Sequence, residues 1–169
     1  MPMTTGTPRP SFEGATAWFN ATGAAAAAQA EGHPTLVHFW SISCDLCKKT
    51  LPRVQKFRDE RAGEGLRVVA IHLPRGEADT DAEAVREAVA MHKITEPCAM
   101  DNEHKLRAAF QHKQGEVPAY YLFDRAGKLR SYAAGAQSLD MLESAIERVL
   151  TTEDSKASAG AVETSQNSP

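Results

Sequence analysis

The sequence predicts an α/β protein, a three-layer α/β/α sandwich around a central mixed β-sheet. Two observations lead to this fold class. Apolar runs at residues 35–40 and 66–73 enclose a helix-like segment at 45–61, which is the pattern of a parallel β-α-β unit. Two further strand-like runs, at 119–123 and 128–134, lie close together in the chain and indicate an antiparallel hairpin. Parallel and antiparallel strands in one chain give a mixed sheet.

Hydrophobic patterning marks each element of the β-α-β unit. Residues 35–40 (TLVHFW) form an apolar and aromatic run after Gly32 and Pro34, as expected for a buried strand. The segment 45–61 carries inward-facing residues at helical spacing, namely Leu46, Thr50, Val54 and Phe57. In residues 66–73 (LRVVAIHL), hydrophobic side chains occur at both odd and even positions, which is typical of a strand covered on both faces.

The second half of the chain continues the alternation. Residues 81–93 predict a helix because apolar side chains align on one face, and residues 103–111 predict a shorter one. Residues 124–127 (DRAG) have tight-turn composition and join the two hairpin strands. A final amphipathic helix is marked by Leu139, Leu142, Ile146, Val149 and Leu150.

The length of 169 residues is that of a single domain, which we place at residues 11–151. Residues 1–10 are polar and broken by proline, so they predict a flexible N-terminal tail. Residues 152–169 are rich in Ser, Thr, Ala and Glu and carry little to bury. We therefore expect a disordered C-terminal tail there.

Composition excludes several classes of partner. The net charge of −3 gives no basic field for nucleic acid or acidic lipid. No segment approaches the ~20 apolar residues that a membrane-spanning helix needs, and the alanine run at 24–28 is too short for the core of a signal peptide. Three cysteines do not make the disulfide framework of a secreted domain. We expect a cytoplasmic monomer that binds neither nucleic acid nor membrane.

The stretch WSISCDLCKK places Cys44 and Cys47 three residues apart, just after a predicted strand and at the start of a predicted helix. A cysteine at a helix N-terminus faces unpaired backbone N–H groups and the positive end of the helix dipole, and both favour its thiolate. Cys44 is therefore the predicted nucleophile. Cys47, one turn further on, is placed to resolve a mixed disulfide. Such a protein needs no cofactor beyond its own Cys44–Cys47 disulfide.

A metal site is the alternative use of the same two cysteines. Four-ligand zinc sites usually show a second CxxC motif or a closely spaced histidine pair. Here the candidate histidines His92, His104 and His112 are scattered, and Cys98 stands alone. We predict no metal. A metal-binding or metal-delivery module remains the rival hypothesis, and metal content measured beside insulin reduction separates the two.

The segment WSISCDLCKKTLP after TLVHF, with Pro52 five positions beyond Cys47, resembles the active-site segment of the thioredoxin superfamily. Val117-Pro118, ahead of the strand AYYLF, resembles the second hallmark of that superfamily. An insertion between LRVVAIHLP and GEVPAYYLFD is similar to that of the TlpA/ResA-type branch, and the resemblance spans residues 8–150. It implies a thioredoxin-like fold and the reduction of protein disulfides by the CxxC pair.

The resemblance also implies roles for residues around the cysteines. Val117–Pro118 is expected to be a cis peptide beside them, with the Val117 backbone pairing with substrate. His38 matches the position of a buried acid that assists proton transfer at Cys47, although it could equally be a core histidine. Trp40 is expected to border the site and position substrate, with plain core packing as the alternative.

Asp45 and Leu46, the two residues between the sulfurs, are expected to tune the redox potential. An acid in the first turn stabilises the helix, but its charge beside Cys44 disfavours the thiolate. A less stabilised thiolate makes a less oxidising couple. We therefore predict a reductant, whose partners are proteins that carry disulfides and an upstream electron donor of unknown identity.

Two expectations complete the sequence-based interpretation. Cys98 follows Pro97 in an apolar segment and is predicted to be a buried structural thiol. Related members of the branch work outside the cytoplasm, so an extracytoplasmic thiol reductant is a further enzyme alternative.

Overall fold

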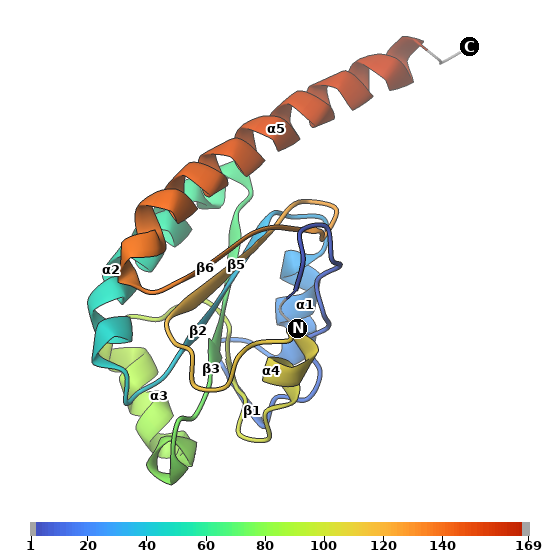
Figure 1. The fold of residues 1–169 in the computed structure, drawn as a ribbon. Helices are drawn as coiled ribbons and strands as arrows, with labels where there is room; N and C mark the ends of the chain where they lie inside the picture. The colour runs from blue at the N-terminus through green and yellow to red at the C-terminus, as the bar shows by residue number, and fades with distance from the viewer. Residues whose placement is uncertain (1–2, 167–169) are drawn as a thin grey trace.

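The computed structural model describes residues 3–166, and the side chains as far as residue 152 (Figure 1). Within this part, six strands form one mixed sheet in the order β1-β4-β3-β2-β5-β6. The strands are β1 (Ala17–Phe19), β2 (Thr35–Trp40), β3 (Arg67–His72), β4 (Cys98–Met100), β5 (Ala119–Phe123) and β6 (Leu129–Ala134). The predicted fold class, an α/β/α sandwich with a mixed sheet, is confirmed.

Strand β2 lies at the centre of the sheet and links its parallel and antiparallel halves. It pairs in parallel with β3 and antiparallel with β5. Beyond β3, β4 continues the parallel half, and β1 closes that edge in antiparallel pairing. On the other side β5 and β6 form the predicted antiparallel hairpin. The β2–α–β3 crossover and the hairpin thus meet at one strand.

Five α-helices of the described part cover the sheet (Figure 1). They are α1 (Gly23–Ala30), α2 (Asp45–Arg61), α3 (Ala82–Met91), α4 (Lys105–Ala109) and α5 (Leu139–Gln166). α1 and α4 lie on one face, where their buried residues join a cluster with Val37, Phe39 and Ile71. α2, α3 and α5 lie on the other face and pack in two clusters against Leu36, Trp40 and neighbouring strands.

Side chains of β2 alternate between the two layers. Val37 and Phe39 point toward α1 and α4, whereas Leu36 and Trp40 point toward α2, α3 and α5. All six residues of β2 are buried, and full burial of each large apolar side chain contributes roughly 1.5–3 kcal/mol to stability. The prediction that residues 35–40 form a buried strand is confirmed.

Three elements escaped the sequence-based prediction, namely β1, α1 and β4. The two strands have three residues each, too few to show an alternating pattern. The sequence of α1 is GAAAAAQA, in which small residues hide any apolar stripe, and Thr22 caps it by accepting a hydrogen bond from Ala25 N. Helices α3 and α4 are also shorter than predicted, whereas α2 has the predicted bounds.

The ends of the chain differ from their sequence-based interpretation. Residues 3–10 were predicted as a tail, but they lie against the β5–β6 hairpin: Gly6 N donates to Leu129 O at 2.7 Å, and Pro8 forms a bridge with Lys128. Met3 is buried in the core cluster under α1 and α4. At the other end α5 continues to Gln166 and takes in most of the predicted C-terminal tail. Residues 167–169 lie outside the described residues.

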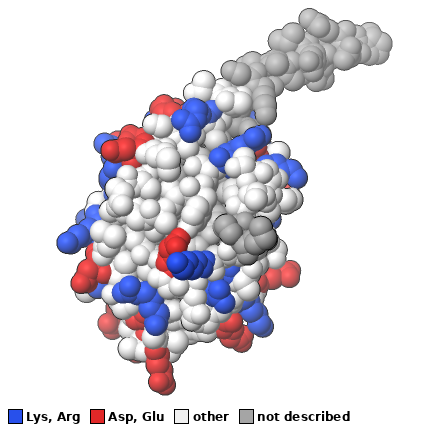
Figure 2. All heavy atoms as spheres, in the orientation of Figure 1, with Lys and Arg blue, Asp and Glu red and all other residues white. Residues whose placement is uncertain are grey.

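The surface carries charges of both signs. Figure 2 shows Lys and Arg interspersed with Asp and Glu on the face in view, without a field of one sign. None of the helices in the described part has both the length and the apolar character to cross a bilayer.

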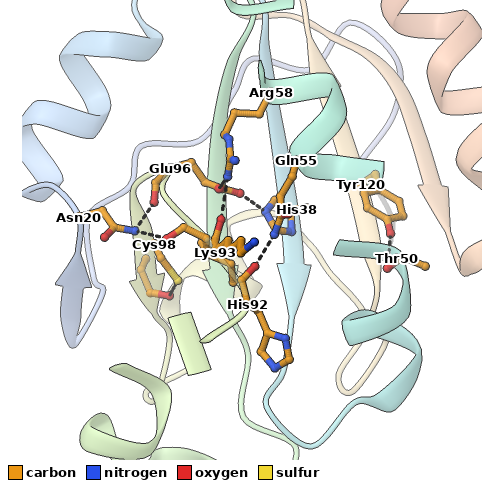
Figure 3. A network of polar contacts seen from close by, with 12 residues as sticks. Asn20, His38, Thr50, Gln55, Arg58, His92, Lys93, Glu96, Cys98 and Tyr120 are labelled. Carbon is orange, nitrogen blue, oxygen red and sulfur yellow. Dashed lines mark hydrogen bonds and ion pairs between the residues drawn. The ribbon is translucent and has the colours of Figure 1, made fainter. Parts of the chain in front are cut away.

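A cluster of charged groups is buried between α2, β2 and the segment before β4 (Figure 3). Nε2 of His38 lies 2.9 Å from Oε2 of Glu96, and the side chains of both are 2% exposed. The other carboxylate oxygen of Glu96 accepts a hydrogen bond from the Arg58 guanidinium at 2.7 Å. Asn20 Nδ2 also donates to the carbonyl oxygens of Ile94 and Glu96, at 2.8 Å each. These contacts fasten the α3–β4 connection to the sheet.

Glu96 is ionised in this cluster. Burial acts to raise its pKa, but the hydrogen bond and charge of His38, a backbone hydrogen bond and the hydrogen bond from Arg58 lower the pKa to about 2. A carboxylate whose pKa falls on folding contributes stability above its ordinary pKa, and this contribution is lost as the pH falls toward the folded value. The stabilisation by Glu96 is therefore present above its ordinary pKa of 4.5 and is lost between there and about 2.

We predict that Glu96→Gln lowers the free energy of unfolding at neutral pH by about 3 kcal/mol, because it removes the buried carboxylate that pairs with both His38 and Arg58. The variant should also lose part of the acid dependence of stability below pH ~4.5. Urea unfolding across a pH series measures both effects. Glu147→Gln, which removes an exposed carboxylate paired with Arg61, is the matched control and should change stability by less than about 1 kcal/mol. Equal stability of the two variants would contradict the prediction.

Candidate functional site

The two cysteines lie where β2 ends and α2 begins. Residues 41–43 leave the sheet, and Cys44 is the N-cap of α2, with an extended backbone. Its Sγ accepts a hydrogen bond from the backbone N–H of Cys47 at 3.0 Å. The two residues are joined as a disulfide, with their Cα atoms 5.2 Å apart. The sulfur of Cys44 therefore occupies the place that a capping oxygen takes at other helices.

The predicted cis peptide at Val117–Pro118 is confirmed. It lies opposite the disulfide, and the carbonyl oxygen of Val117 is 3.8 Å from Sγ of Cys44. Sheet register explains the juxtaposition: Ala119, the first residue of β5, pairs with Phe39 near the end of β2, so the residues before β5 come alongside those after β2.

The side chains around the disulfide divide into exposed and buried groups. Asp45 and Leu46 are exposed in the first turn of α2, and Leu46 is one of the few large hydrophobic side chains at the surface, at 43% exposure. Trp40 is buried at 1% exposure in the cluster that also holds Cys44 and Cys47. Trp40 therefore packs in the core beside the cysteines, which is the alternative that the sequence offered. Its predicted role in substrate positioning stays a prediction.

His38 lies on the predicted sheet face, toward α2, and its hydrogen-bond partner is Glu96 (Figure 3). Within the described part of the chain, its ring forms no hydrogen bond with Cys47. Glu96 escaped the sequence-based prediction. In the sequence Glu96 is an acidic residue within the largely apolar segment ITEPCAM. Without the fold, it cannot be distinguished from a surface residue.

The β3–α3 connection also reaches the site, which the sequence did not indicate. Side chains of His72, Arg75 and Asp79 contact residues 41–43, the turn that leads into Cys44. In the sequence this connection (PRGEADTD) has only the composition of a loop.

Cys98 is fully buried and free, as predicted. Burial raises the pKa of its thiol to about 12, against a smaller lowering by a hydrogen bond with Trp40. A thiol of this kind is unreactive at neutral pH. Within the described part of the chain, no group of three or more His, Cys, Asp or Glu side chains is arranged to hold a metal ion.

The arrangement supports thiol–disulfide exchange. The N–H of Cys47 and the N-terminus of α2 stabilise negative charge on the Cys44 sulfur. Cys47 lies within bonding distance, so a mixed disulfide on Cys44 can be displaced internally.

Comparison with known proteins agrees with this chemistry. The chain matches the model of the AhpC/TSA family over residues 5–132. It is 46% identical over 144 residues to the thiol-disulfide oxidoreductase YkuV of Bacillus subtilis (strain 168), covering 85% of this chain and 94% of YkuV. The sporulation thiol-disulfide oxidoreductase A of the same organism is 25% identical over 113 residues, which cover 67% of this chain and 66% of that protein.

Solved structures give the same result. The solution structure of a thioredoxin-like protein in the oxidized form aligns with a TM-score of 0.77 at 43% identity, over 89% of this chain and 99% of that one. The resemblance that was inferred from WSISCDLCKK and Val117-Pro118 is therefore confirmed. Both the extent of the family match and the paired Cys44 and Cys47 show that the chain belongs to the AhpC/TSA family of thioredoxin-like proteins and is a thiol-disulfide oxidoreductase.

Proposed function

We propose that this protein is a monomeric, cytoplasmic reductant of protein disulfides, with Cys44 as nucleophile and Cys47 as resolving cysteine. The observation that carries the proposal is the Cys44 sulfur at the N-cap of α2, where the Cys47 N–H reaches it at 3.0 Å. A cytoplasmic setting is supported by the cysteine content, since three cysteines do not make the disulfide framework of a secreted domain.

The proposed cycle transfers two electrons. The Cys44 thiolate attacks one sulfur of a substrate disulfide, and the other substrate sulfur leaves as a thiolate and takes up a proton. Cys47 then loses its proton and attacks Sγ of Cys44, which releases the second substrate thiol and leaves the Cys44–Cys47 disulfide. An upstream dithiol donor reduces this disulfide by the same exchange in reverse.

Substrate positioning is assigned to the segment beside the sulfurs. The Val117 carbonyl, 3.8 Å from Cys44 Sγ, can accept a backbone hydrogen bond from an extended substrate, and Pro118 holds this segment at the start of β5. The exposed Leu46 adds an apolar contact on the other side of the disulfide. Main-chain recognition of this kind suits disulfides in proteins of varied sequence.

The proton at Cys47 is assigned to His38 acting with Glu96. His38 lies on the sheet face that α2 covers, and α2 carries Cys47 into the same layer. Glu96 holds the His38 ring in place by accepting a hydrogen bond from its Nε2 at 2.9 Å.

We expect Cys47→Ser to accumulate mixed disulfides on Cys44, because the attack that releases the substrate is removed. Non-reducing electrophoresis followed by mass spectrometry measures the trapped partners. Cys98→Ser in the same background is the matched control and should trap as many partners, since Cys98 is buried. Absence of trapping, or trapping that persists in Cys44→Ser/Cys47→Ser, would contradict the assignment of Cys44 as nucleophile.

We predict that His38→Ala slows the resolution of the mixed disulfide and alters the pH dependence of its rate, because Cys47 loses its proton acceptor. Stopped-flow thiol release across a pH series measures this. Glu96→Gln should change the same profile, whereas His33→Ala, at a site remote from the disulfide on the loop after α1, should not. An unchanged profile in a folded His38→Ala protein would exclude the role.

We predict that Asp45→His makes the Cys44–Cys47 couple more oxidising. Loss of the negative charge stabilises the Cys44 thiolate, and a tenfold change in the equilibrium with glutathione corresponds to about 30 mV. A glutathione redox titration measures the potential. Glu60→His, the same change near the far end of α2, should leave the potential in place. A shift of Asp45→His toward a more reducing potential would refute the tuning by Asp45.

A further inference from the structure

The turn that delivers Cys44 to α2 is held by a buried carboxylate that the reaction cycle does not use. A single oxygen of Asp79, Oδ2, accepts hydrogen bonds from Ser41 Oγ at 2.9 Å, Ser43 Oγ at 2.7 Å and the backbone N of Arg75 at 2.9 Å. Asp79 is only 4% exposed. Three donors converging on one buried oxygen fix both the turn and the start of the β3–α3 connection.

Arg75 completes the connection from the solvent side. Its Nε donates to Ser43 Oγ at 3.1 Å, and a terminal guanidinium nitrogen donates to the carbonyl oxygen of Ser43. Ser43 precedes Cys44 directly, and consecutive Cα atoms are about 3.8 Å apart. The guanidinium is therefore held beside the N-terminus of α2, where it adds positive charge at the end that already favours a thiolate.

The hydroxyl of Ser43 joins these two opposite charges. The hydroxyl accepts a hydrogen bond from Arg75 Nε and donates one to Asp79 Oδ2, so it links the two side chains at the turn. Asp79 is ionised: burial acts to raise its pKa, but hydrogen bonds from Ser43, the Arg75 backbone and Ser41 hold the pKa below its ordinary value. An ionised Asp79 needs a counter-charge, and Arg75 provides it through Ser43.

His72 contributes a neutral contact to the same turn. Its Nε2 accepts a hydrogen bond from the backbone N of Ile42 at 3.1 Å. Burial lowers the pKa of His72 to about 4, against the opposing charge of Asp79, so it is uncharged at neutral pH. The charged groups on the segments around Cys44 are then Asp45, Lys48 and Lys49 of α2, Glu116 before β5, and Arg75, Glu77, Asp79 and Asp81 of the β3–α3 connection. Of these, Arg75 is the cation hydrogen-bonded to the residue before Cys44.

We propose that Arg75 is a positioning residue for Cys44: held by Asp79 and Ser43, its guanidinium stabilises the Cys44 thiolate and offsets the opposing charge of Asp45. The proposal rests on the proposed function for the identity of the nucleophile. It adds that the β3–α3 connection sets the reactivity of that nucleophile. If Arg75 had a purely structural role, replacing it would lower the stability of the protein and leave the Cys44 pKa unchanged.

The test is the pH dependence of iodoacetamide alkylation of Cys44 in the reduced full-length protein, followed by peptide mass spectrometry. Arg75→Gln should raise the Cys44 pKa by about half a unit, and so slow alkylation about threefold below that pKa, the size expected for one solvent-exposed charge. Arg75→Lys keeps the charge and should recover at least part of the rate. Arg86→Gln, an equal loss of charge on α3 where Arg86 packs over Phe19, is the matched control and should alkylate like the unaltered protein.

A double-mutant cycle tests the anchoring by Asp79. In an Asp79→Asn background, the increase in the Cys44 pKa caused by Arg75→Gln should be at most half of the increase seen with Asp79 present. The reason is that the guanidinium is no longer held against the turn. A Cys44 pKa in Arg75→Gln equal to that in Arg86→Gln would overturn the proposal. If Arg75→Gln changes the Cys44 pKa equally with Asp79 and with Asn at position 79, the role of Asp79 would be overturned. Alkylation requires no protein substrate, so these results stand apart from those of the trapping experiment.

Discussion

The hydrogen bond from the Cys47 N–H to the Cys44 sulfur is the interaction around which the rest of the site is arranged. It forms because Cys44 ends an extended segment and caps α2. Backbone N–H groups in the first turn of a helix have no partner within the helix, and the Cys44 sulfur accepts the hydrogen bond of one of them, that of Cys47. A thiolate is the form of cysteine that such donors favour most. The same contact brings the second cysteine to the first, which lets the pair close into an intramolecular disulfide.

The sheet places the second half of the site. Strand β2 ends at Trp40 and its antiparallel neighbour β5 begins at Ala119, so the chain that leaves one strand and the chain that enters the other meet at one edge. Val117 and Cys44 are 73 residues apart in sequence and in contact only for this reason. A rigid central strand that is buried on both faces is therefore a condition for chemistry at its end.

Two polar clusters flank this edge, and they differ in kind. His38 and Glu96 are buried between α2 and the sheet, where an ionised carboxylate is tolerated because both of its oxygens are paired, one of them with Arg58. Asp79 and Arg75 act on the turn before Cys44. Glu96, Arg75 and Asp79 come from connections that follow or precede parallel strands, the segments that α/β proteins commonly use to build sites.

The sequence by itself determined the fold class and the CxxC pair, because hydrophobic period and short motifs are local properties, and the cis peptide at Val117–Pro118 was expected from the resemblance to thioredoxins. The central strand, α2 and the hairpin could be located in this way, whereas β1, β4 and α1 could not, since they are too short or too rich in alanine to carry a periodic signal. Only the tertiary structure decided that Trp40 is enclosed, that Glu96 is the partner of His38, and that Asp79 and Arg75 hold the turn before Cys44. These contacts join residues that are distant in the sequence, and their energies depend on burial and distance, which no local pattern records.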